Sequence, residues 1–136
     1  ISGGDWFDLG GMMNAITPQS LNKGSLLGIH KLNLKLKKGV TLEQFKAYYT
    51  NTLIPAYENA FKGASLSLAD GLRGADKGRL GMVWIFDSSD VRDLYFDKNG
   101  MSTELNQELT ASLKNVDDGL AELGTWTSKY TDWSIQ

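Results

Sequence analysis

Residues 26–37 carry the clearest structural pattern in the chain, because leucine alternates there with polar side chains. Leu32, Leu34 and Leu36 fall on one side of an extended segment, together with His30, which is the only histidine. A period of two is typical of a β-strand whose faces meet different surroundings. The sequence therefore predicts a strand with one apolar face, and this face carries the one histidine.

The composition is that of a globular protein and excludes several classes. A length of 136 residues with 41% hydrophobic and 22% charged residues indicates one domain of ordinary size. The net charge of -2 shows no basic excess, so no nucleic-acid partner is predicted. The chain has no cysteine, which excludes disulfides and thiol nucleophiles. No apolar run approaches the roughly 20 residues of a membrane-spanning helix, so no membrane partner is predicted.

Residues 1–24 are expected to form an extended N-terminal arm rather than part of the domain. Glycines interrupt this segment, and its Trp6-Phe7 pair is expected to dock on the body or on a partner chain. The sequence begins with isoleucine, so we expect that processing or design removed an upstream segment. A soluble, cytoplasmic protein is the default expectation for localisation, and export stays open.

Two longer segments have the spacing of amphipathic helices. Apolar side chains recur at helical spacing over 42–61, where Thr41 and Gln44 form a predicted capping box and Pro55 is expected to kink or divide the helix. Residues 103–123 predict a second amphipathic helix, and 91–96 a short helical segment.

Three further segments are predicted to be strands. Residues 64–70 alternate, 79–87 are apolar on both sides, and 126–135 are rich in threonine, tyrosine and tryptophan. A glycine-rich turn at 71–78 joins the first two of these. A strand that is apolar on both sides is expected to be covered on both faces.

The resulting order, β-α-β-β-α-β, predicts an α+β ferredoxin-like fold over residues 25–136. In that fold a four-stranded antiparallel sheet carries both helices on one face. The third strand, with Leu27 and Ile29 of the first, would then leave apolar area on the open face. Burying that area is favourable, so we expect a homodimer in which two sheets pack face to face.

Two segments give the chain a resemblance to a known superfamily. The first is Gly28-Ile29-His30, and the second, residues 83–96, reads Val-Trp-Ile-Phe-Asp-Ser-Ser-Asp-Val-Arg-Asp-Leu-Tyr-Phe. With the element order, they resemble the dimeric α+β barrel superfamily, which includes antibiotic-biosynthesis-type monooxygenases and EthD-like proteins. The resemblance implies a dimeric barrel that holds a small organic molecule, in its interior or between sheet and helices.

The phase of the first strand decides which residues face the barrel. If its leucine face meets the helices, Lys31 and Asn33 look into the barrel, and if the phase is reversed His30 does so. We prefer the first phase, because helices need a continuous apolar surface. The ligand-binding candidates are therefore Lys31, Asn33, Trp84, Tyr49 and Tyr130.

His30 is the one candidate catalytic residue, and three interpretations of it stay open. The simplest is a histidine paired by a hydrogen bond near the strand end. The second is a general acid/base or ligand-orienting residue, and the third is a metal ligand. Lys31 could likewise attract an anionic ligand or belong to a solvated strand end.

No metal site and no cofactor are predicted. Asp87, Asp90, Asp93 and Asp97 suggest a calcium loop, but with Gly100 at position six of such a loop, positions one and twelve hold no carboxylate. Helix capping by these acids is the better explanation.

Three functional hypotheses follow from these observations. The leading one is a dimeric barrel protein that binds a small organic molecule in its cleft. The second is a cofactor-independent monooxygenase-like enzyme acting on an aromatic or polyphenolic substrate through His30. The third is a structural or interaction protein whose barrel is filled by its own side chains.

Overall fold

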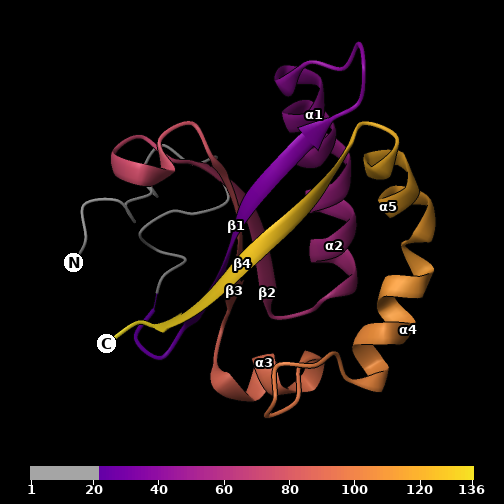
Figure 1. The fold of residues 1–136 in the computed structure, drawn as a ribbon. Coiled ribbons are helices and arrows are strands. Elements are labelled where there is room, and N and C mark those ends of the chain that lie inside the picture. Colours follow the sequence, from indigo (N-terminus) through magenta and orange to yellow (C-terminus); the bar gives the residue numbers. More distant parts are fainter. Residues whose placement is uncertain (1–21) are drawn as a thin grey trace.

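The computed structural model describes residues 22–136, and residues 1–21, with most of the predicted arm, lie outside the described part. The strands form one antiparallel sheet in the order β2-β3-β1-β4 (Figure 1). Their bounds are β1 (Leu26–Leu36), β2 (Ala64–Asp70), β3 (Leu80–Phe86) and β4 (Gly124–Ser134). The first and third strands are therefore central, as the predicted fold requires.

The helices lie on one side of this sheet (Figure 1). They are α1 (Leu42–Tyr48), the π-helical η4 (Tyr49–Leu53), α2 (Ile54–Ala60), α3 (Ser89–Tyr95), α4 (Glu104–Ser112) and α5 (Lys114–Ala121). A short 3-10 turn, η5 (Gly74–Asp76), interrupts the β2–β3 connection. The element order and the sheet confirm the α+β ferredoxin-like fold.

Pro55 divides the first predicted helix, and a π-helical turn precedes it. The helix begins with the predicted capping box, in which the Thr41 hydroxyl accepts from the Gln44 N–H and the Gln44 side chain accepts from the Thr41 N–H. Pro55 has no N–H to donate, and just before it the N–H of Ile54 reaches back to the carbonyl of Tyr49. This turn leaves the Tyr49 and Leu53 side chains buried.

The prediction of one continuous helix over 103–123 is wrong. The helix breaks at Leu113, which separates α4 from α5. The break lets α5 lie close to α1, where the Tyr48 hydroxyl donates to the carbonyl of Val116 at 2.9 Å. A side chain at Gly119 would collide with that hydroxyl, so the close approach depends on glycine.

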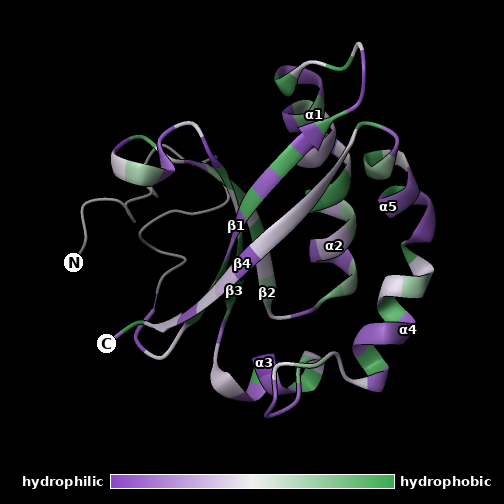
Figure 2. Cartoon of the chain, in the orientation of Figure 1, coloured by the Kyte–Doolittle hydropathy of each residue, from purple (hydrophilic) through white to green (hydrophobic). Residues whose placement is uncertain are grey.

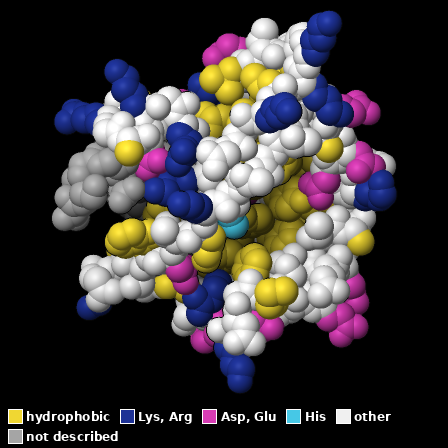
Figure 3. Space-filling view, in the orientation of Figure 1, with side chains coloured by type: hydrophobic (Ala, Val, Ile, Leu, Met, Phe, Trp, Pro, Cys, Tyr) yellow, Lys and Arg dark blue, Asp and Glu magenta, His cyan; other side chains and the backbone are white. Residues whose placement is uncertain are grey.

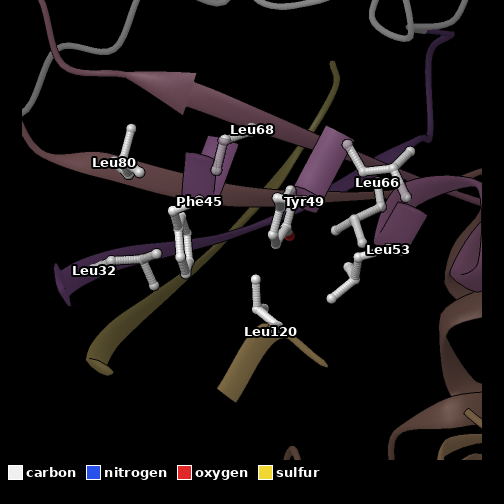
Figure 4. Close-up of a cluster of buried hydrophobic side chains, with 9 residues drawn as sticks. Leu32, Phe45, Tyr49, Leu53, Leu66, Leu68, Leu80 and Leu120 are labelled. Atoms are coloured by element: carbon white, nitrogen blue, oxygen red, sulfur yellow. The ribbon is translucent and has the colours of Figure 1, made fainter. Parts of the chain in front are cut away.

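The leucine face of β1 meets the helices, which confirms the preferred phase of that strand. Leu32 packs with Phe45 and Tyr49 in the largest buried cluster (Figure 4). Figure 2 shows hydrophobic and hydrophilic residues alternating along β1, as expected for a strand with one apolar face. The cluster consists of Leu32, Phe45, Tyr49, Leu53, Ile54, Leu66, Leu68, Leu80 and Leu120.

The opposite face of the sheet carries a second, smaller group of buried side chains. Leu27, Val83 and Ile85 are buried there together with Ala69. Exposed apolar area lies instead on the edge strand β4, where Trp133 is 60% exposed.

Truncating Phe45 tests the packing of the helices on the sheet. Its side chain is completely buried, so Phe45→Ala should lower the free energy of unfolding by about 3–5 kcal/mol in urea titrations. Leu42→Ala on the same helix is the control and should cost far less, because Leu42 is 36% exposed. Equal losses in the two variants would contradict the packing.

Candidate functional site in the cleft between sheet and helices

Two adjoining cavities lie on the helix side of the sheet, and we call them together the cleft. The Tyr130 cavity has a volume of about 310 Å³ and the Tyr49 cavity about 360 Å³. Of the residues that the structure describes, Trp84 alone lines both. Figure 3 shows the histidine at the edge of a hollow lined by hydrophobic side chains.

Each cavity is lined by strands and helices together. The Tyr130 cavity is lined by His30, Trp84, Phe86, Arg92, Phe96, Asp97, Lys98, Gly100, Tyr130 and Asp132. The Tyr49 cavity is lined by Tyr49, Leu53, Tyr57, Leu66, Met82, Trp84, Asp117, Leu120 and Trp126. The first therefore has a charged and aromatic wall, and the second is mostly apolar.

Neighbouring aromatic rings hold the Trp84 side chain in place. It projects from the central strand β3 and stacks on Phe86, with ring centroids 5.9 Å apart and planes 4° apart. Tyr57 and Phe61 meet it edge-on at 5.9 Å and 5.4 Å. Both arrangements are favourable for aromatic pairs. The half-buried indole is therefore a well-supported wall for both cavities.

His30 and Tyr130 form a pair at the edge of the Tyr130 cavity. They lie opposite each other in the β1–β4 register, and their ring centroids are 4.7 Å apart. The His30 Nδ1 atom lies 3.3 Å from the Ser128 hydroxyl. Burial lowers the pKa of His30, which favours the neutral imidazole at pH 7. A neutral imidazole can accept a proton from a bound molecule.

Gly28 provides the space that the Tyr130 ring occupies. A Cβ atom at Gly28 would lie 2.8 Å from both Cε2 and Oη of Tyr130, closer than such atoms approach. The sequence reasoning missed this role. Its one signal is a glycine within a strand, which often marks close approach of another group.

The charges around the Tyr130 cavity compensate one another. Arg92 pairs with Asp132 at 3.0 Å and with Asp93 at 2.9 Å. Burial raises the pKa of Tyr130, and the charge and hydrogen bonding of Asp132 raise it further. The rim therefore offers both donors and acceptors without a dominant charge.

Tyr57 and Asp117 bring a hydrogen-bonded pair to the Tyr49 cavity. The Tyr57 hydroxyl donates to Oδ1 of Asp117 at 2.5 Å, joining α2 to α5. The pKa of Asp117 is raised, mainly because the carboxyl group is partly buried. The hydrogen bond from Tyr57 opposes this shift, and the charge of neighbouring Asp118 adds to it. Burial also raises the pKa of Tyr57, as does this hydrogen bond. The sequence reasoning missed Asp117, whose only signal is an acidic residue beside the apolar stripe of its helix.

The structure brings four of the six predicted site residues together. His30, Trp84, Tyr49 and Tyr130 line the cleft. The other two, Lys31 and Asn33, lie on the opposite face of the sheet. Lys31 forms an ion pair with buried Asp76 at 3.1 Å, which also binds Arg79, and Asn33 is exposed near the strand end.

Two kinds of site are not found in the described part of the chain. Within residues 22–136, no group of three or more histidine or acidic side chains is placed to hold a metal ion. No helix in the same range is both long and apolar enough to cross a membrane.

Comparisons with known proteins identify no family for this chain. No model of a known protein family matches it, and no curated protein matches it. A solved structure from Bacteroides fragilis NCTC 9343, of a dimeric protein of unknown function with a ferredoxin-like fold, is similar at 14% identity and a TM-score of 0.44. The match covers 83% of this chain and 98% of the other. The resemblance to the dimeric α+β barrel superfamily therefore stays a prediction.

The single histidine makes its environment directly measurable. Its NMR titration in the folded protein should have a midpoint below 6.5, because burial disfavours the imidazolium. As pH falls below 6.5 the unfolded chain binds the proton first, so the free energy of unfolding should decrease until folded His30 titrates as well. His30→Gln should remove this part of the pH dependence of the free energy of unfolding. A midpoint at or above 6.5 would contradict the buried placement.

Proposed function

We propose that this protein binds a small organic molecule with a flat apolar body in the cleft, against the Trp84 ring. The observation that carries the proposal is the position of Trp84, which borders both cavities and is itself supported by aromatic neighbours. Flat rings stack favourably on such a surface. A few polar groups at each end could orient the molecule.

The dimensions and the lining of the cleft support binding rather than a purely structural role. Its two cavities, of about 310 and 360 Å³, each reach the size of ordinary ligand pockets, which begin at roughly 300 Å³. Aromatic and aliphatic side chains dominate the Tyr49 cavity, as is typical of such pockets, and the Tyr130 cavity adds charged groups beside its aromatic rings. A protein that used the cleft only for packing would be expected to fill it.

Replacing Trp84 tests the proposal with propylbenzene as the probe. Binding measured by NMR titration should be at least about tenfold weaker in Trp84→Ala, because the stacking surface is lost. Trp133→Ala is the matched control and should bind normally, since Trp133 is exposed on the opposite face. The absence of propylbenzene binding to the unmodified protein, or equal weakening in both variants, would argue against the cleft as the binding site.

A second candidate function is cofactor-independent oxygenation of a polyphenolic molecule. The observation that favours it is a neutral His30 that lines the cavity beside Tyr130. There, His30 would take the proton of a substrate hydroxyl as general base and so make the ring more electron-rich. Trp84 would hold the ring in place.

Turnover of a panel of quinols and polyphenols tests this second function. Oxygen consumption should occur with the unmodified protein and fall at least about a hundredfold in His30→Ala, the usual contribution of a general base. Trp133→Ala, which alters an exposed side chain on the opposite face of the sheet, is the control. Unchanged turnover in His30→Ala would rule out the catalytic role of His30.

The homodimer stays a prediction and is separate from the binding proposal. The described residues that line the cleft lie on the helix side of the sheet, opposite the face on which a second copy is expected. If two sheets pack face to face, Asn33 and the Lys31–Asp76 pair would lie near the interface rather than near the ligand. Their role would then be in assembly.

A further inference from the structure

We propose that Tyr49 and Asp117, with Tyr57 as a positioning residue, form a hydrogen-bonding anchor for an uncharged hydroxyl group of the ligand. The anchor lies in the Tyr49 cavity, beneath α5, so that the apolar body of the ligand would extend toward Trp84. This inference rests on the proposed function, because it names the chemistry of the molecule that the cleft would bind.

Tyr49 supplies the first half of the anchor. Its side chain is only 1% exposed, yet its hydroxyl has no hydrogen-bond partner among residues 22–136. The residue lines the cavity, so the hydroxyl is available to a molecule within it. A ligand oxygen that accepts from Tyr49 would give this hydroxyl the hydrogen bond that the described residues do not supply.

Asp117 supplies the second half, held in place by Tyr57. The Tyr57 hydroxyl already donates its proton to Oδ1 at 2.5 Å, which fixes the orientation of the carboxyl group. The other oxygen, Oδ2, has no hydrogen-bond partner in the described range. It can therefore accept a proton from a ligand group in the same cavity.

A hydroxyl group has the chemistry that both halves of the anchor require. Its oxygen can accept from Tyr49 while its hydrogen is donated to Asp117. A ligand carboxylate has no proton to donate and would bring negative charge next to Asp117. Within residues 22–136, no lysine or arginine lines the Tyr49 cavity to offset that charge. The anchor thus favours alcohols and phenols over organic acids of the same shape.

Three probes of matched shape test the anchor: propylbenzene, para-propylphenol and para-propylbenzoate. With the unmodified protein, NMR titration should show para-propylphenol binding at least about tenfold tighter than propylbenzene. The benzoate should bind more weakly than the phenol.

Conservative variants locate the anchor. Tyr49→Phe and Asp117→Asn should each reduce the preference for the phenol at least about fivefold while propylbenzene affinity is unchanged. Asp118→Asn, the exposed neighbour of Asp117, is the matched control and should keep the preference. The propylbenzene measurements also show that the variants stay folded.

The outcomes separate the anchor from the proposed function. If propylbenzene and the phenol bind equally, or if Tyr49→Phe and Asp117→Asn both keep the preference, the anchor is wrong although the cleft still binds apolar molecules. If the benzoate binds most tightly, the anchor is also wrong, because its chemistry excludes anions. If none of the probes binds, the proposed function fails and the anchor with it.

Discussion

The packing of aromatic rings around Trp84 is the interaction on which the rest of the site depends. Phe86 supports the indole by stacking from the same strand, while Tyr57 and Phe61 meet it from the helix side. Through Tyr57 the same cluster reaches Asp117 and hence α5. If the indole were removed, the two cavities would lose their common wall, and Tyr57 of α2 would lose its edge-on contact with Trp84 of β3.

The cleft exists because the helices do not fit continuously over the sheet. Pro55 imposes a π-helical turn that brings Tyr49 to the cavity, and the break at Leu113 lets α5 approach α1. These irregularities leave space between α5, the sheet and the segment after α3. A regular pair of helices would be expected to fill more of that space with side chains.

Local patterns in the sequence predict the elements but not the site. The alternating leucines predict β1 and the side of it that faces the helices. The capping box predicts the start of the first helix, and Pro55 predicts its division. The partners of His30 depend instead on β1–β4 pairing, which joins residues 98 positions apart. The bond between Tyr57 and Asp117 likewise spans 60 positions and follows from the docking of α5. No local spacing contains that information, and the same holds for the space that Gly28 leaves for Tyr130.

The most direct test is a crystal structure of the protein with para-bromophenol, in which the anomalous signal of bromine locates the ligand. The account predicts one peak in the cleft beside Trp84, with the phenol oxygen directed toward Tyr49 and Asp117. A peak on the opposite face near Val83, or a cleft filled by the protein's own side chains, would contradict it.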